Sequence, residues 1–476
     1  MRSWARAALG VAELLVSAAI HLGYAFYIFG TAVAADVSVS LVKGLMAGGG
    51  VAKDVAVDGE DEAAAVLDDG AVPPIVLVHG IFGFGKGRLG GLSYFAGAEK
   101  KDDRVLVPDL GSLTSVHDRA RELFYYLKGG QVDYGEEHSR EYGHSRFGRT
   151  YARGHYPAWD EEHPVHLVGH SAGAQVIRLL QQMLHDREFE GHGDTSERWV
   201  LSVTSLSGAL NGTTRAYIDG MRAEKEGGGR WLRPVCLLQI CRVGSVLYHW
   251  LDLPWLKRYY DFGFDHFGMS RRVVGVAGLA EILLDAGSGG GRRGPFATGD
   301  WILPDLTIQG AARINARVRT FPATFYFSYA SRRTARSPPG SAGATVPSGV
   351  TRIHPLLFIR VLQMCRWRYP AGADPPYQGY RDEDWEDNDG ALNTFSMTHP
   401  RIPVEHPSVQ VEKDEDCRPL RPGIWYYKIV EADHMTFVIN RRRGGVQFDL
   451  VYDSIFDNCR KHVFRTAPPP TLPVQS

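Results

Sequence analysis

Short apolar runs that alternate with amphipathic stretches constrain the fold of this chain more than any other feature. The runs are rich in β-branched residues, which is typical of strands buried on both faces of a parallel sheet. The stretches between them place apolar residues on one stripe at helical spacing, as a helix that covers a sheet requires. The alternation predicts an α/β fold with a mostly parallel central sheet and helices on both faces. Predicted strands lie at 73–80, 104–110, 164–170, 199–206, 324–330 and 423–430, with helices at 117–127, after Ser171 and near 448–463.

Charge and cysteine content exclude several classes of protein. The 476 residues include 53 Lys+Arg and 54 Asp+Glu, a formal net charge of -1. Without a basic excess, no nucleic-acid partner is predicted. The 5 cysteines are scattered and never show Cys-x-x-Cys spacing, so neither a disulfide scaffold nor a cysteine-based zinc knuckle is expected.

The apolar segment 14–35 is long enough to cross a bilayer as a helix, and His21 is its only strongly polar residue. Two arginines precede it, so the positive-inside rule would leave the N-terminus cytosolic. Two alternatives stay open: a signal peptide with the AVA at 32–34 as cleavage site, and a helix lying in the membrane interface. Residues 1–45 are therefore interpreted as a membrane anchor or signal segment, which predicts a membrane-associated protein or one in the secretory pathway.

The rest of the chain divides into a linker, one large domain and a tail. Residues 46–72 are small and acidic without sustained periodicity, which indicates a flexible linker. Residues 73–466 hold all the predicted strands and helices, and 467–476 are expected to be a disordered tail. Within the large domain the segment 229–260 is strongly apolar and aromatic, which predicts a helical cap over about 215–268.

The motif GHSAG at 169–173 fits G-x-S-x-G, and it follows an apolar strand and opens an amphipathic helix, as the motif requires. Such a turn holds Ser171 in a strained backbone conformation that lifts its hydroxyl clear of the sheet. It also aims the N–H of Ala172 at a developing oxyanion. The glycine-rich loop 79–85 follows the first strand, and the N–H of Ile81 is the candidate second donor. Together these residues indicate nucleophilic catalysis by a serine.

A serine hydroxyl is a weak nucleophile that needs a base, and the base needs an orienting acid. In chains with this motif the acid and then a histidine follow the serine. Asp389 stands before a glycine turn, and His434 stands just past the last predicted strand, so these two are the candidates. Spacing alone leaves rivals for both roles. The rivals are Asp384 and Asp387 for the acid, and His399, His406 and His462 for the base.

The order of these motifs from about Pro74 to about Phe464 is similar to that of a known family. The chain resembles the large secreted bacterial lipases of the staphylococcal and thermophilic-bacillus type and their plant α/β-hydrolase relatives. The longest match is VDYGEEHSREYGHSRFGRTY at 132–151. Further matching segments are PIVLVHGIFGFG, VHLVGHSAGAQ, LSVTSL with NGTT, DFGFDHFGMSRR and NDGALNTFSM. The resemblance implies an α/β-hydrolase fold with a helical lid.

The resemblance also implies roles for individual residues. Ser171 would be the nucleophile, Asp389 the acid and His434 the base. Asp389 is preferred over its neighbours because NDG followed by N-T is the pattern of the family. The backbone N–H groups of Ile81 and Ala172 would form the oxyanion hole.

The family carries a zinc site made by two Asp and two His. The matching positions here are Asp118, His138, His144 and Asp265. A closed set of four side-chain ligands is typical of a structural zinc site rather than a catalytic one. The resemblance therefore implies a zinc ion that pins the cap to the core.

The family's calcium site fits this chain less well. Its members place a carboxylate two residues after the catalytic histidine, and the residue there is Thr436. The segment that follows, VINRRRGG, is basic where acidic ligands would be needed. Calcium dependence is therefore not expected.

The resemblance implies a serine-dependent lipase or esterase that hydrolyses carboxylic esters of acyl lipids, of the triacylglycerol type, through an acyl-enzyme. Its partners would be a lipid or ester substrate and a membrane or lipid interface. For the segment 229–260, a buried helical pair and a lid with a lipid-binding face stay equally open. One alternative function is a phospholipid or galactolipid acyl hydrolase, or an acyltransferase, on the same triad. A catalytically inactive, membrane-tethered binding protein is the other.

Overall fold

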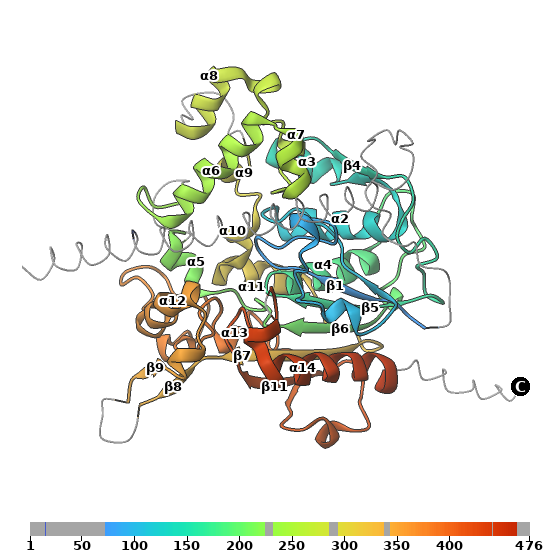
Figure 1. The fold of residues 1–476 in the computed structure, drawn as a ribbon, viewed down its shortest axis with the longest axis vertical. Helices are drawn as coiled ribbons and strands as arrows, with labels where there is room; N and C mark the ends of the chain where they lie inside the picture. Colours follow the sequence, from blue (N-terminus) through green and yellow to red (C-terminus); the bar gives the residue numbers. More distant parts are fainter. Residues whose placement is uncertain are drawn as a thin grey trace, which may run out of the picture.

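The centre of the protein is a parallel sheet, shown in the computed structural model of Figure 1, which describes residues 72–223, 232–284, 294–337, 343–439 and 441–463 together with Leu15. The sheet has 7 strands in the order β10-β11-β7-β6-β5-β1-β2. Every neighbouring pair is parallel, so the prediction of a mostly parallel sheet is confirmed. The strands are β1 (Ile75–Val78), β2 (Val105–Leu106), β5 (Val165–His170), β6 (Val200–Leu206), β7 (Phe325–Arg332), β10 (Ser408–Gln410) and β11 (Trp425–Glu431).

Both faces of the sheet are buried, because successive side chains of a strand point to opposite faces. In β1, Val76 and Val78 belong to one apolar cluster, whereas Ile75 and Leu77 belong to a second. The first cluster includes side chains of α2 and α4, and the second includes side chains of α14. This arrangement explains why the strands are continuous apolar runs rather than alternating ones.

Helices surround the sheet, and two short hairpins extend from it (Figure 1). The hairpins pair β3 (Gly130–Asp133) with β4 (Phe147–Tyr151) and β8 (Thr334–Arg336) with β9 (Thr345–Pro347). The helices of the first half are α2 (Val116–Lys128), α3 (Glu136–Tyr142), α4 (Gly173–Asp186), α5 (Thr214–Asp219), α6 (Leu237–Leu251), α7 (Pro254–Tyr259) and α8 (Arg271–Leu284). Those of the second half are α9 (Pro295–Thr298), α10 (Ile302–Leu306), α11 (Ile308–Arg317), α12 (Pro355–Arg366), α13 (Thr394–Thr398) and α14 (Arg441–Asp457).

The cap predicted over about 215–268 corresponds to helices that project from the sheet body. In Figure 1, α6, α7 and α8 stand together at the top, away from the sheet. Helix α8 extends the projection past the predicted limit. The projecting helices therefore reach beyond the bounds predicted for the cap, and both the cap and its action as a lid stay predictions.

The predicted membrane or signal segment lies outside the described residues, apart from Leu15, as do the tail and nearly all of the linker. Within the part of the chain that the structure describes, no helix has both the length and the apolar character to cross a bilayer.

Candidate active site and metal cluster

Ser171 occupies a sharp turn between the end of β5 and the start of α4. Its φ is 55°, in the left-handed region that non-glycine residues rarely adopt. Two glycines make this turn possible by close approach. A Cβ on Gly173 would lie 2.4 Å from the carbonyl oxygen of Val78, and one on Gly80 would lie 2.7 Å from Ser171 Cβ. The strained strand–turn–helix geometry expected from GHSAG is therefore present.

Asp389 and His434 form a buried ion pair near this turn. His434 Nδ1 lies 2.8 Å from Asp389 Oδ2, and Ser331 Oγ donates to the same oxygen at 2.5 Å. The other oxygen, Oδ1, accepts the backbone N–H groups of Ala391 and Leu392 at 2.9 and 2.8 Å. Both carboxylate oxygens are thus held in place within the protein.

The electrostatics of Asp389 favour its charged form. Burial alone would raise the pKa of the Asp389 carboxyl, but the neighbouring His434 and the hydrogen bonds hold this pKa below its usual value. A carboxylate that stays ionised can orient an imidazole and stabilise it once it gains a proton.

His434 lies beside the turn that holds Ser171. Its ring centroid is 4.8 Å from that of His170, the residue directly before Ser171, and His170 Nε2 lies 3.3 Å from the His434 carbonyl oxygen. Among the described residues no hydrogen bond joins the Ser171 hydroxyl to the His434 ring. Catalytic hydrogen bonds often tighten only when substrate binds, so this geometry is compatible with a triad, whose roles stay predictions.

The rival residues have partners elsewhere. Asp384 pairs with Arg381, and Asp387 accepts a hydrogen bond from Thr334. His399 contacts Glu405, His406 contacts Thr320, and His462 lies at the end of the short helix that follows α14. Within the described residues, Asp389 is the acid that contacts His434.

The two candidate oxyanion donors have free N–H groups. Ala172 precedes the first residue of α4, where backbone N–H groups lack partners in the helix. Ile81 lies in a loop whose neighbours are fixed, because Phe82 donates to the Ser112 carbonyl and Gly83 to the Gly80 carbonyl. In the described part of the chain neither the Ile81 nor the Ala172 N–H donates a hydrogen bond, so both remain available to a ligand.

A second polar cluster brings together two carboxylates and two histidines. Potential ligand atoms of Asp118 (α2), His138 (α3), His144 and Asp300 all lie within 4.8 Å of one another. His138 Nε2 is 3.2 Å from Asp118 Oδ1, and His144 Nε2 is 3.2 Å from Asp300 Oδ2. The predicted gathering of Asp118, His138 and His144 is therefore correct.

The fourth predicted ligand was wrong. Asp265 is largely exposed and pairs with His249 and Lys257, whereas Asp300 completes the cluster. The neighbour of Asp265 does contribute, since His266 Nε2 lies 3.1 Å from Asp118 Oδ2 and can orient that ligand. Asp300 stands alone before α10, and no local pattern in the sequence marks it.

Three atoms of the cluster that make no hydrogen bond fit a cation. His138 Nε2, His144 Nε2 and Asp300 Oδ2 are buried and make no hydrogen bond. Buried polar atoms without partners are costly, and a metal ion would satisfy all three at once. Two imidazoles and two carboxylates match the ligand types of a closed zinc site.

Thr436, at the position of the family's calcium-binding carboxylate, lies in a turn where its hydroxyl donates to Asp433. Asp433 Oδ1 accepts the Thr436 hydroxyl and the Met435 N–H, both at 3.0 Å. Asp433 Oδ2 accepts the His354 N–H at 2.6 Å. Because these oxygens already have donors and Thr436 brings no charge, the residues do not fit a calcium ion.

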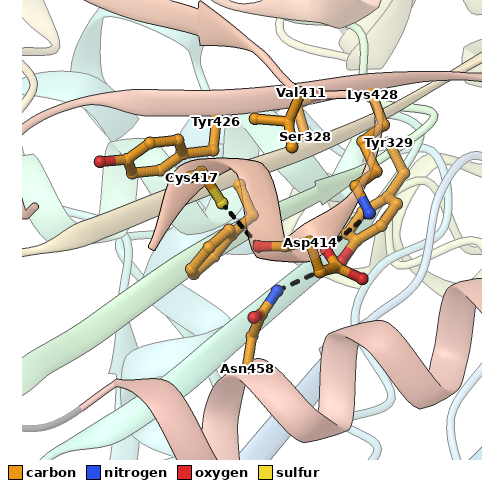
Figure 2. A pocket seen from close by; sticks show the side chains of 9 residues that line it. Ser328, Tyr329, Val411, Asp414, Cys417, Tyr426, Lys428 and Asn458 are labelled. Atoms are coloured by element: carbon orange, nitrogen blue, oxygen red, sulfur yellow. Dashed lines mark hydrogen bonds and ion pairs between the residues drawn. The ribbon is translucent and has the colours of Figure 1, made fainter. Parts of the chain in front are cut away.

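The pocket in Figure 2 is separate from both clusters. Its volume is about 10 Å³, room for one water molecule. Lys428 and Asp414 pair inside it at 2.6 Å, so its charges are satisfied. No predicted site residue lines it, and the pocket is too small for a substrate. The lining residues are Phe327, Ser328, Tyr329, Val411, Asp414, Cys417, Tyr426, Lys428 and Asn458.

The parallel sheet and the strained strand–turn–helix at Ser171 together define an α/β-hydrolase fold. Comparisons with known proteins agree. A family model described as "Lipase-like, C-terminal domain" matches residues 72–197. The lipase of Staphylococcus hyicus is 27% identical over 413 residues, which is 81% of this chain and 57% of that protein. The chain therefore spans a little over half the length of this relative.

Solved structures show the same similarity to lipases. The crystal structure of Staphylococcus hyicus lipase aligns with a TM-score of 0.60 and 26% identity, covering 82% of this chain and 97% of that one. EstA from Clostridium botulinum aligns with a TM-score of 0.60 and 25% identity, covering 85% of this chain and 90% of that one. In sequence and in fold the chain is therefore similar to staphylococcal-type lipases over most of its length, as its motifs suggest.

Proposed function

We propose that this chain is a carboxylic ester hydrolase that acts on acyl lipids of the triacylglycerol type. The observation that carries the proposal is the buried Asp389–His434 pair beside the strained Ser171 turn. The names of the relatives, which are lipases, support the same reaction class.

In the proposed reaction His434 takes the proton of Ser171 Oγ as the oxygen attacks the ester carbonyl. The free N–H groups of Ile81 and Ala172 stabilise the oxyanion that forms. His434 then gives its proton to the departing alcohol, which leaves an acyl group on Ser171. In the second half His434 activates water, the acyl-enzyme is hydrolysed, and Asp389 keeps the imidazole oriented throughout.

The decisive test is hydrolysis of p-nitrophenyl esters of graded chain length by the full chain and by Ser171→Ala. The variant should lose activity by more than about 10⁴-fold and should no longer be labelled by a fluorophosphonate probe. Ser337→Ala, which changes a partly buried serine just after β8, is the matched control and should behave like the wild type. Persistent labelling of Ser171→Ala would overturn the assignment.

We propose in addition that the projecting helices form a lid with a lipid-binding face. Exposed apolar side chains on α6 follow one helical stripe, and further ones lie on α7 and α8, a concentration that is unusual on a monomer surface. They are Ile240, Val243, Leu247, Leu251, Trp255, Val273, Val276 and Leu284.

A charge on this face should separate interfacial from soluble substrates. Val243→Asp should lower hydrolysis of emulsified triglyceride several-fold and leave that of a soluble short-chain ester unchanged. Val350→Asp, which places the same charge at an exposed valine elsewhere, should change neither. Equal losses on both substrates would exclude a lipid-binding role for this face.

We also propose that the metal is zinc, held by Asp118, His138, His144 and Asp300 and acting as a structural ion. It would tie α2, α3 and the segment before α10 together. For the N-terminal segment we propose membrane attachment or entry into the secretory pathway. Carbonate extraction of membranes tests the attachment, because release of the full-length protein would exclude a spanning helix.

A further inference from the structure

The hydroxyl group of Tyr94 lies at the centre of a buried row of hydrogen bonds behind the turn that holds Ser171. The Gly80 N–H donates to Tyr94 Oη at 3.2 Å, and Tyr94 Oη lies 2.9 Å from His170 Nδ1. His170 Nε2 in turn lies 3.3 Å from the His434 carbonyl oxygen. Tyr94, His170 and Gly80 are all buried.

The direction of each hydrogen bond in this row follows from the groups at its two ends, the His434 carbonyl and the Gly80 N–H. A carbonyl oxygen can only accept, so His170 Nε2 must carry the proton that it shares with His434. A neutral imidazole then has an unprotonated Nδ1, which must accept from the Tyr94 hydroxyl. The oxygen of Tyr94 is left free to accept the Gly80 N–H. The row of hydrogen bonds therefore has a single consistent arrangement of protons.

Burial favours the protonation states that this arrangement needs. Burial raises the pKa of the Tyr94 phenol to about 12, so the hydroxyl keeps its proton. Burial, and then the charge of neighbouring His434, hold the pKa of His170 well below its usual value, so its ring stays neutral.

This row of hydrogen bonds connects three parts of the proposed site. Gly80 precedes Ile81, the second oxyanion donor. His170 precedes Ser171, and His434 is the base. The backbone of His434 is held on both sides, since its N–H donates to the Asp389 carbonyl at 3.1 Å while its own carbonyl is held by His170.

We infer that Tyr94 and His170 are positioning residues that set the oxyanion loop and the base relative to Ser171. This inference rests on the proposed ester hydrolysis. Neither side chain needs to touch substrate, because Tyr94 acts through Gly80, which precedes the oxyanion donor Ile81, and His170 acts through the backbone of His434. Without the Tyr94 hydroxyl, the Gly80 N–H and His170 Nδ1 would be buried without partners. The loop and the base would then shift to find other partners, and small displacements at an active site are costly in rate.

The test compares Tyr94→Phe, His170→Leu and their double variant with the wild type, using a soluble p-nitrophenyl ester. Each single variant should lower kcat by about 10-fold, below the loss of roughly 10²-fold for a 1 Å misplacement, with KM changed less than twofold. Because the two residues act through one row of hydrogen bonds, the double variant should be no slower than the slower single variant.

Tyr326→Phe is the matched control. The Tyr326 hydroxyl is also buried, accepts the Phe321 N–H and donates to Gln181, but it contacts no proposed catalytic residue. This variant should cost stability like Tyr94→Phe and leave kcat unchanged. His170→Gln should restore much of the kcat lost in His170→Leu, because its side-chain amide can donate to the His434 carbonyl.

Several outcomes would overturn the inference. One is a kcat for Tyr94→Phe that equals that of Tyr326→Phe, and another is a double variant whose losses multiply. If Tyr94→Phe fails to fold, the comparison of His170→Leu with His170→Gln decides, and equal activities overturn the inference. A wild-type protein that hydrolyses no ester would overturn the proposed function and this inference together, whereas an active wild type with unaffected variants overturns only this inference.

Discussion

The two buried polar clusters of this domain differ in how complete they are. In the proposed triad, both oxygens of Asp389 have donors within the protein. In the second cluster, which is made by Asp118, His138, His144 and Asp300, the atoms His138 Nε2, His144 Nε2 and Asp300 Oδ2 make no hydrogen bond. The first cluster is therefore stable as protein alone, whereas the second is complementary to a cation.

The largest expected effect tests the triad side of this comparison. Asp389→Asn should lower kcat by about 10⁴-fold, because the amide can hold His434 only in the wrong tautomer. The fold should persist, which circular dichroism and the melting temperature can show. Asp384→Asn, in the rival acid, is the control and should keep wild-type kcat. An equal loss in both variants would contradict the assignment.

Loss of the metal tests the second cluster of this comparison, the one proposed to bind zinc. Asp300→Ala and His144→Ala should abolish stoichiometric zinc, measured by elemental analysis of protein purified without chelator. The melting temperature should fall by about 10 °C, the shift that a tightly bound structural ligand typically supplies. Asp265→Ala should retain both zinc and stability. Zinc loss in Asp265→Ala, with zinc kept in Asp300→Ala, would restore the ligand set expected from the sequence.

A smaller effect tests whether the hydrogen bond from Ser331 to Asp389 matters for the rate. Ser331→Ala removes one hydrogen bond to the carboxylate and leaves the pair with His434 intact. A hydrogen bond to a charged group contributes about 1.5–3 kcal/mol, so kcat should fall roughly 10-fold or more. Ser337→Ala is the control. An unchanged kcat in Ser331→Ala would mean that the remaining donors suffice.

The smallest expected effect concerns calcium. The Asp433 oxygens already have donors, so treatment with EGTA followed by the return of zinc alone should leave the melting temperature and the activity unchanged. Zinc has to be returned because EGTA binds zinc at least as tightly as calcium. A calcium-reversible loss would show that the hydrogen bonds around Asp433 give way to an ion.

Local patterns made much of this structure predictable. Four apolar runs define β1, β2, β5 and β6, because a strand buried on both faces must be apolar throughout. The turn at Ser171 is predictable because two of the glycines that it requires, Gly169 and Gly173, belong to the same short motif. The sheet and the turn at Ser171 are therefore encoded locally.

Features that join distant segments were not predictable in the same way. Asp300 meets His144 only after the chain has passed through the cap, and nothing beside Asp300 distinguishes it from Asp265 as a ligand. The contacts of Tyr94 with Gly80 and His170 likewise depend on tertiary packing. A lone tyrosine in the loop GLSYFAG carries no pattern of its own.

The most direct test of the central claim is mass spectrometry of the protein quenched with acid during turnover of a p-nitrophenyl ester. The account predicts an added acyl mass on the peptide that contains Ser171, more of it in Asp389→Asn if deacylation is slowed further than acylation, and none in Ser171→Ala. Steady hydrolysis by the wild type with the acyl group on another residue, and still present in Ser171→Ala, would contradict the account.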